Sequence, residues 1–230
     1  MKCVILQPSY IPWRGFFHQI AKADVFIFYD DVQYDKRGWR NRNRIKTAHG
    51  PQWLTIPVSA SGVQQEGTPI NQIKIQNETA WQEEHWKTIE QAYAKAPYFD
   101  QYAYMLYEFY KRRTNYLADF TVATTVALAS ILGLTDTRFI RSSSLDGIEG
   151  TKTERLINIL TKLGADHYIT GPSAENYIDH KQFDDRGIQL EFMEYNYPDY
   201  QQLHGDFEPQ VSIIDLMFMQ GSRALDFILV

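Results

Sequence analysis

The chain has 230 residues and a formal net charge of −5, and 44% of its residues are hydrophobic. This length allows one or two domains, and this apolar fraction excludes intrinsic disorder. The single cysteine excludes an intramolecular disulfide framework and a multi-cysteine zinc site. With no secretory signal and no long apolar run, we expect a soluble, cytoplasmic protein without a membrane span.

The first thirty residues follow a strand–helix–strand pattern. Residues 2–6 form an apolar run that ends at Gln7-Pro8, residues 15–23 repeat apolar side chains at helical spacing, and residues 25–29 form a second apolar run. Such a unit implies parallel strands joined by a right-handed crossover. Further on, the sequence predicts irregular structure at 32–50, a strand at 53–58 and a hint of another strand at the isoleucines of 70–75.

Helices and strands alternate to the end of the chain. Residues 79–131 are predicted to be helical, as are residues 152–163, which end at Gly164, and residues 212–219. Strands are predicted at 139–141, 167–170 and 188–192. This alternation predicts a single α/β domain over residues 1–230, with a mostly parallel sheet, flanking helices and a helical insertion at about 79–132.

The loop after the first strand is the first candidate site. Residues 7–15 contain two prolines, a glycine, and the polar or aromatic side chains of Gln7, Tyr10 and Trp13. In open α/β sheets, ligands bind beyond the carboxyl ends of the strands, and amides at the start of the next helix can face an anion. The alternative is an ordinary turn with packed aromatic side chains.

Two acids end the second strand. Asp30 and Asp31 follow residues 25–29, and carboxylates at such a position often bind a ribose or a metal, or move a catalytic proton. The alternative is a strand-ending turn with a helix-capping aspartate. Because neighbouring parallel strands end at one edge of the sheet, we expect these acids and the first loop to share a site.

A basic segment follows at residues 35–46, which hold six of the 23 lysines and arginines of the chain. It includes Trp39, Arg40, Asn41 and Arg42, and guanidinium and amide groups together suit phosphate. The alternative is a solvated charged loop. Because the sequence pI is about 5.7, a small phosphate-containing molecule is a better expected ligand than nucleic acid.

Histidine and serine supply further candidates. His85 lies on an apolar helix face, which suits either packing or catalysis, and no histidine has zinc-binding spacing. Ser173 and Tyr177 follow the strand at 167–170, and their spacing of four residues would put both on one helix face toward a ligand. Lys152, near the start of the preceding helix, is either a surface charge or part of that site.

Several stretches of the chain together resemble the WbqC-like protein family. They are Gln7–Gly15, Asp30–Gln33, Trp39–Arg42, Trp53–Val58, Lys152–Ile157, Tyr168–Ala174 and Ser212–Leu216. The resemblance implies a product of a bacterial surface-polysaccharide (O-antigen) gene cluster. Because such clusters handle nucleotide-activated amino sugars, it further implies acyl or aminoacyl transfer.

The first strand, the proline-rich turn, Gly15 and the following helix also resemble the start of a HIGH-type nucleotidylyltransferase. That family places two histidines beside the glycine, where this chain has Trp13 and Phe16. The resemblance therefore implies a related fold. It does not imply the histidine-dependent mechanism, because the two histidines are absent from these positions.

The leading hypothesis is an enzyme that transfers an acyl group to the amine of a nucleotide-linked sugar. Its candidate general bases are Asp30, Asp31 and His85, and asparagine at both aspartates is expected to abolish turnover with stability nearly intact. The expected binding residues are Gln7, Tyr10, Trp13, Gln33, Trp39, Arg40, Asn41, Arg42, Trp53, Lys152, Ser173 and Tyr177.

Two alternative functions stay open at this point. One is a non-catalytic protein that binds an activated sugar or an acyl carrier. The other is a nucleotidyltransferase-like enzyme that lacks the HIGH histidines. The sequence predicts no metal site and no nucleic-acid partner, identifies no cofactor, and leaves an acyl carrier as a candidate partner.

Overall fold

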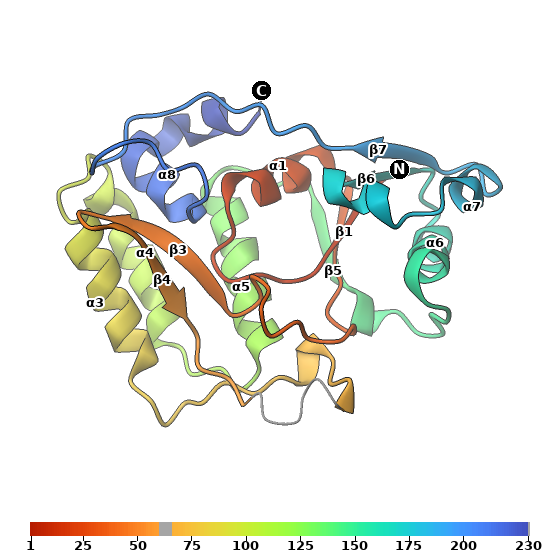
Figure 1. Ribbon diagram of the computed structural model, residues 1–230, viewed down its shortest axis with the longest axis horizontal. Coiled ribbons are helices and arrows are strands. Elements are labelled where there is room, and N and C mark those ends of the chain that lie inside the picture. The colour runs from red at the N-terminus through yellow and green to blue at the C-terminus, as the bar shows by residue number, and fades with distance from the viewer. Residues whose placement is uncertain (60–65, 230) are drawn as a thin grey trace.

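A five-stranded parallel sheet forms the centre of the computed structural model, which describes residues 1–59 and 66–229 (Figure 1). The strands lie in the order β5-β2-β1-β6-β7, and each adjacent pair is parallel. The predicted α/β fold is confirmed, whereas a relation to HIGH-type folds stays a prediction. The strands are β1 (Lys2–Leu6), β2 (Val25–Phe28), β5 (Arg138–Arg141), β6 (His167–Thr170) and β7 (Gln189–Phe192).

Helices cover both faces of the sheet and build a region beside it. The helix predicted at 152–163 has the predicted bounds, and the segment predicted to be helical at 79–131 contains three helices. No helix within the described residues is long and apolar enough to cross a membrane. The helices are α1 (Arg14–Lys22), α3 (Trp81–Tyr93), α4 (Phe99–Lys111), α5 (Leu117–Ile131), α6 (Lys152–Leu163), α7 (His180–Asp184) and α8 (Ile213–Gln220).

Alternate side chains of the strands are buried on opposite faces of the sheet. Val4, Phe26 and Phe28 belong to a core shared with α1, α3, α4, α5 and α8. Ile5 and Ile27 belong to a second core shared with α6 and α7. Figure 1 shows α6 and α7 on one side of the sheet and the other helices on the opposite side. Since helices cover both faces, β1 and β2 are nearly continuous apolar runs, and the sequence therefore located them.

The basic segment does not stay irregular, as the sequence predicted, but forms an antiparallel hairpin of β3 (Arg42–Thr47) and β4 (Gly50–Thr55). Asn43 and Ile45 face inward and are buried, while Arg42 and Arg44 lie on the outer face. Because the outward positions carry arginine, the segment looked like a charged loop. The bounds predicted for the strand at 53–58 were also wrong by three residues at each end, because β4 begins at Gly50 and ends at Thr55.

Short 3₁₀ turns replace two other predicted features. Ile70, Ile73 and Ile75 are all buried, yet the chain forms the turn η1 (Ile70–Gln72) and isolated bridges instead of a strand. After β6 the chain forms η3 (Pro172–Asn176) instead of an α-helix, so Ser173 and Tyr177 do not share a helix face. The remaining 3₁₀ turns are η2 (Ser142–Ser144) and η4 (Gly221–Phe227).

A buried polar network attaches α8 to the rest of the molecule. The Asp215 carboxylate is fully buried and accepts hydrogen bonds from the hydroxyls of Tyr93 and Tyr200, each at 2.8 Å. The Gln202 amide donates a third bond at 2.9 Å. Burial raises the pKa of Asp215. This network holds the C-terminal segment over α1 and α3, which matters because that segment contributes to the cavity described next.

Candidate functional site

The strand order creates a topological switch point between β1 and β6. These strands are neighbours in the sheet, but the chain leaves β1 toward β2 on one side and leaves β6 toward β7 on the other. The loops that follow the two strands therefore diverge and leave room between them. In open α/β sheets this is the place where ligands bind.

A cavity of about 430 Å³ occupies this point, and we call it the switch-point cavity. Its volume falls within the range of small-molecule sites. Five of the binding residues predicted from the sequence line it: Gln7, Trp13, Trp39, Arg40 and Ser173. The other lining residues are Leu6, Ser9, Pro12, Phe16, Gln19, Asn43, Gly171, Pro172, Tyr195 and Gln210.

The loop between β1 and α1 is held in a strained conformation at the cavity. Ile11 is a buried, non-glycine residue with a φ of 34°, a value that costs energy and often accompanies function. The Asn43 amide stabilises the loop by donating to the carbonyls of Tyr10 at 3.1 Å and Ile11 at 2.7 Å. At Gly15, an added Cβ would lie 2.3 Å from the Trp13 indole. Glycine therefore allows this indole to fold over the start of α1.

Arg40 brings a positive charge to the cavity wall. Its guanidinium donates to the Gln7 carbonyl at 3.0 Å and to the Ser9 hydroxyl at 2.9 Å. Its buried Nε has no partner, and within residues 1–59 and 66–229 no carboxylate forms an ion pair with it. Burial lowers the pKa of Arg40 to about 10, so the group keeps its charge at neutral pH.

Aromatic side chains form the other walls. Trp13 and Tyr195 meet edge to face with ring centroids 5.0 Å apart, and the Gln19 amide donates to the Tyr195 hydroxyl at 2.8 Å. Burial raises the pKa of Tyr195 to about 12, so this hydroxyl stays protonated and can donate. At the other end, Trp39 packs on Trp53 with ring centroids 5.1 Å apart.

The two predicted catalytic aspartates lie outside the cavity lining and are occupied by other contacts. Asp30 is fully buried, pairs with the Arg141 guanidinium at 2.5 Å and accepts from the Ser143 hydroxyl at 2.9 Å. Asp31 accepts from Arg155 at 2.6 Å and from the Ser142 hydroxyl at 2.5 Å. These contacts join the ends of β2 and β5 and attach α6 to them.

His85 and Tyr10 also lie outside the cavity lining, in the core beneath the first loop. The Tyr10 hydroxyl is 2.9 Å from His85 Nδ1 and 2.6 Å from the Tyr110 hydroxyl. Burial lowers the pKa of His85 to about 4, against a smaller opposing effect of its hydrogen bond to the Thr55 backbone. The imidazole is therefore neutral at pH 7, and its polar contacts are with Tyr10 and the Thr55 backbone.

The other predicted binding residues are spread around the molecule and do not line the cavity. The Asn41 amide is buried and donates to the Ile56 carbonyl at 2.8 Å, and Arg42 stacks over Trp53 at 4.6 Å. Gln33 forms an isolated bridge with Pro69. Lys152 and Tyr177 are exposed, and Lys152 starts α6 with a φ of 50°.

The lining residues that the sequence did not predict as binding residues include the polar side chains of Gln19, Asn43, Tyr195 and Gln210. Gln19 follows from helical spacing, because it lies one turn beyond Phe16 on the same face of α1. Tyr195 and Gln210 reach the cavity only through the packing of the C-terminal segment, and no local pattern marks them. Within the described residues, no group of three acidic, histidine or cysteine side chains is placed to hold a metal ion.

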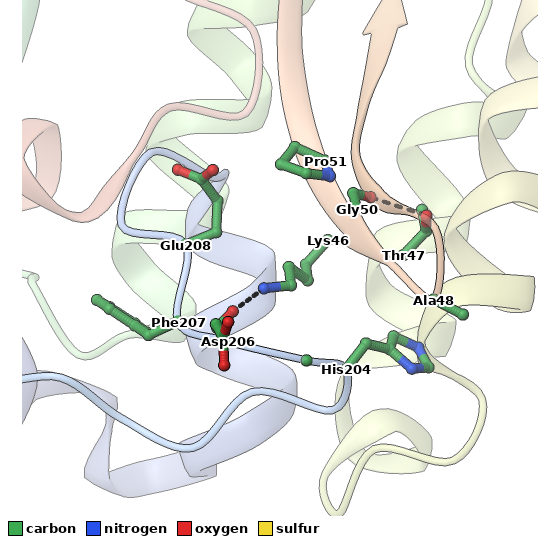
Figure 2. A pocket seen from close by; sticks show the side chains of 10 residues that line it. Lys46, Thr47, Ala48, Gly50, Pro51, His204, Asp206, Phe207 and Glu208 are labelled. Atoms are coloured by element: carbon green, nitrogen blue, oxygen red, sulfur yellow. Dashed lines mark hydrogen bonds between the residues drawn. The ribbon is translucent and has the colours of Figure 1, made fainter.

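A second cavity, of about 310 Å³, lies between the turn of the hairpin and residues 204–208 (Figure 2). Lys46 is its buried cation, and Figure 2 shows its ammonium bonded to the Asp206 backbone. His204 is likewise bonded to the Ala92 carbonyl at 3.1 Å. Because the side-chain nitrogens of Lys46 and His204 already have partners, the switch-point cavity is the better candidate for an anionic ligand.

Comparisons with known proteins identify the family. Residues 7–227 match the model of the WbqC-like protein family, which confirms the resemblance seen in the sequence. Over 230 residues the chain is 43% identical to "Uncharacterized protein Rv1507c" of Mycobacterium tuberculosis (strain ATCC 25618 / H37Rv). That alignment covers 99% of this chain and 97% of the relative. No solved structure matches the chain significantly.

Proposed function

This chain belongs to the WbqC-like protein family, and we propose that it binds a nucleotide-activated amino sugar in the switch-point cavity and transfers an acyl group to the sugar's amine. In this proposal the reaction serves surface-polysaccharide (O-antigen) biosynthesis. One observation supports it most: the Arg40 guanidinium on the cavity wall forms no ion pair within the described residues, and the charge of Asp35 acts on it only from beyond ion-pair distance. A buried charge is costly when unpaired, and a phosphate oxygen would pair with it.

The start of α1 adds to this preference for an anion. Pro12, Trp13 and Phe16 line the cavity at the first turn of the helix, and no side chain caps that end. The backbone amides at a helix start and the helix dipole both favour negative charge there. Arg40 and the start of α1 thus act together on the phosphates, while Gln7 and Ser173 offer polar groups to the rest of the ligand.

The proposal gives Asp30, Asp31 and His85 positioning roles instead of the general-base role expected from the sequence. Each already has its hydrogen-bonding partners, and none lines the cavity. The sugar amine therefore enters as the free base. Its nitrogen bonds to the acyl carbon, the bond to the donor's leaving group breaks with its electron pair, and the proton leaves to solvent.

A non-catalytic binding protein is the second candidate. One observation favours it: among the described residues, no carboxylate or imidazole lines the switch-point cavity. The two functions differ in a direct assay. The chain is incubated with nucleotide-linked amino sugars and acyl thioesters, and the sugars are analysed by mass spectrometry. Acylated sugar supports the transferase, and saturable binding without any mass change supports the binder.

The location of the ligand is tested with a blocking substitution. Ser173 lies exposed on η3 at the cavity, so Ser173→Tyr fills the entrance without disturbing the core. Asn176→Tyr puts the same ring on the same turn away from the cavity and serves as the matched control. In calorimetric titrations we expect at least about tenfold weaker binding for Ser173→Tyr alone, with similar melting temperatures. Equal affinities for the two variants would place the ligand elsewhere.

A further inference from the structure

The switch-point cavity changes in character from one end to the other. At its inner end, Gln19 is 4% exposed and Phe16 is 6% exposed. At its outer end, Trp39 is 40% exposed and still lines the cavity. A ligand would therefore have one part enclosed among polar and aromatic side chains and another part against an open indole face.

Trp39 is held rigidly for a side chain so exposed. Its ring packs on Trp53 at 5.1 Å, and the Arg42 guanidinium stacks on Trp53 at 4.6 Å. The Trp39 backbone carbonyl accepts a hydrogen bond from the Tyr10 amide at 3.2 Å, and this bond ties Trp39 to the first loop. Since the indole is already ordered, stacking a second ring on it costs little conformational entropy.

Arg40 is intermediate in exposure between Trp39 at the outer end and Gln19 at the inner end. It follows Trp39 in the chain, and its guanidinium reaches inward to the Gln7 carbonyl and the Ser9 hydroxyl. The cavity thus presents an aromatic face at the mouth, then a cation, then the linked amide and hydroxyl of Gln19 and Tyr195. A nucleotide sugar has the same three parts in the same order: base, phosphates and sugar.

On the basis of the proposed function, we infer that the ligand enters sugar first, with the nucleobase stacked on Trp39 at the mouth and the phosphates on Arg40. The sugar lies at the inner end, where Gln19 and Tyr195 contact its hydroxyl and amine groups. Because stacking is tolerant of base identity, the inner end selects the sugar and the mouth accepts different nucleotides. Trp39 is thus an affinity determinant for the nucleoside half of the ligand.

The test separates the two halves of the ligand. The wild-type chain is first titrated with UDP-, GDP- and dTDP-linked amino sugars, and the tightest ligand is chosen. Its nucleoside monophosphate and its amino sugar 1-phosphate are then titrated separately into wild type, Trp39→Ala, Trp39→Phe and Gln19→Ala. Tyr116→Ala is the matched control, because Tyr116 is a similarly exposed aromatic residue, at 36%, and lies outside the cavity lining.

We expect Trp39→Ala to weaken binding of the nucleotide sugar and the nucleoside monophosphate by roughly 10- to 100-fold. Its effect on the sugar 1-phosphate should stay below about threefold, and Trp39→Phe should restore most of the loss. Gln19→Ala should weaken the sugar 1-phosphate and spare the nucleoside monophosphate. Tyr116→Ala should leave all three affinities unchanged.

Two results would overturn the inference in distinguishable ways. If Trp39→Ala weakens the sugar 1-phosphate as much as the nucleoside monophosphate, or more, the ligand does not enter sugar first, while the proposed binding of nucleotide sugars stands. If no nucleotide sugar binds the wild-type chain, the proposed function fails and this orientation fails with it.

Discussion

The carboxyl edge of the sheet has two halves that differ in one respect: charge is neutralised in one and left unpaired in the other. Beyond β2 and β5, Asp30 pairs with Arg141 at 2.5 Å and Asp31 pairs with Arg155 at 2.6 Å. Beyond β1 and β6, Arg40 lines a cavity of about 430 Å³ and forms no ion pair within the described residues, since Asp35 acts on its charge only from beyond ion-pair distance. The first half connects parts of the fold, and the second is the proposed binding site.

This difference follows from the direction of the connections. From β1 the chain runs to β2 and then to β5 on the same side, so the ends of β2 and β5 lie beneath loops that pack together. The loops after β1 and β6 diverge instead. A carboxylate at a strand end is therefore not enough to locate a site, since the crossover directions decide whether space remains for a ligand.

The largest predicted effect is a loss of stability when the ion pairs beyond β2 and β5 are broken. Asp30→Ala removes one of the two carboxylates that pair with Arg141, together with the acceptor of the Ser143 hydroxyl and amide. Removing one partner of a buried pair typically costs about 3–5 kcal/mol, and we expect a loss of that size in denaturant unfolding. Asp119→Ala is the matched control, because Asp119 contacts the same arginine at 2.5 Å but is 44% exposed.

For Asp119→Ala we expect a loss below about 1 kcal/mol. Asparagine at Asp30 and Asp31 should also destabilise the chain, contrary to the expectation from sequence that stability would stay nearly intact. Near wild-type stability of Asp30→Ala would contradict the structural role assigned to this half.

The next effect concerns the buried histidine beneath the first loop. Burial lowers the pKa of His85 to about 4 from an ordinary 6.5. Between about pH 6.5 and pH 4, His85 is protonated in the unfolded chain but neutral in the folded chain. The free energy of unfolding therefore falls as the pH drops through this range. The shift corresponds to about 3 kcal/mol over that window.

The measurement is the free energy of unfolding across this pH range in wild type and His85→Gln. Glutamine can bond to Tyr10 and the Thr55 backbone without titrating, so its pH dependence should be shallower by about that amount. Parallel curves for the two proteins would show that His85 does not titrate abnormally.

A smaller effect distinguishes the arginines of the two halves. Arg40→Gln removes the unpaired cation, and we expect roughly 10- to 100-fold weaker binding of a nucleotide sugar, the size of a charge-assisted hydrogen bond. Arg141→Gln should instead lower stability and leave the affinity of the folded protein within about threefold. The two variants are compared by calorimetric titration and by denaturant unfolding. Weaker binding for Arg141→Gln together with unchanged affinity for Arg40→Gln would contradict the roles assigned to the two halves.

The sequence predicted the centre of the sheet well because β1 and β2 are apolar and buried on both faces. Residues 167–170 and 152–163 have the predicted bounds, since an apolar run and a terminal glycine mark them locally. The prediction was wrong at the hairpin of β3 and β4. Asn43 and Ile45 alternate there with arginines on the outer face, so the segment has no apolar run typical of a strand.

For the site, the sequence identified the strand ends but could not separate their two halves. The partners of Asp30 and Asp31, Arg141 and Arg155, lie more than 100 residues away in the chain. Tyr195 reaches the cavity through similarly distant contacts with α1. Such pairings depend on tertiary packing, which no local pattern of residues records.

The most direct test of the central claim is a crystal structure of the chain with its tightest-binding nucleotide-linked amino sugar. We predict a phosphate oxygen at about 2.7–2.9 Å from the Arg40 guanidinium, with the ligand between the loops that follow β1 and β6. A ligand bound at the ends of β2 and β5 or in the hairpin cavity, with Arg40 untouched, would contradict the account.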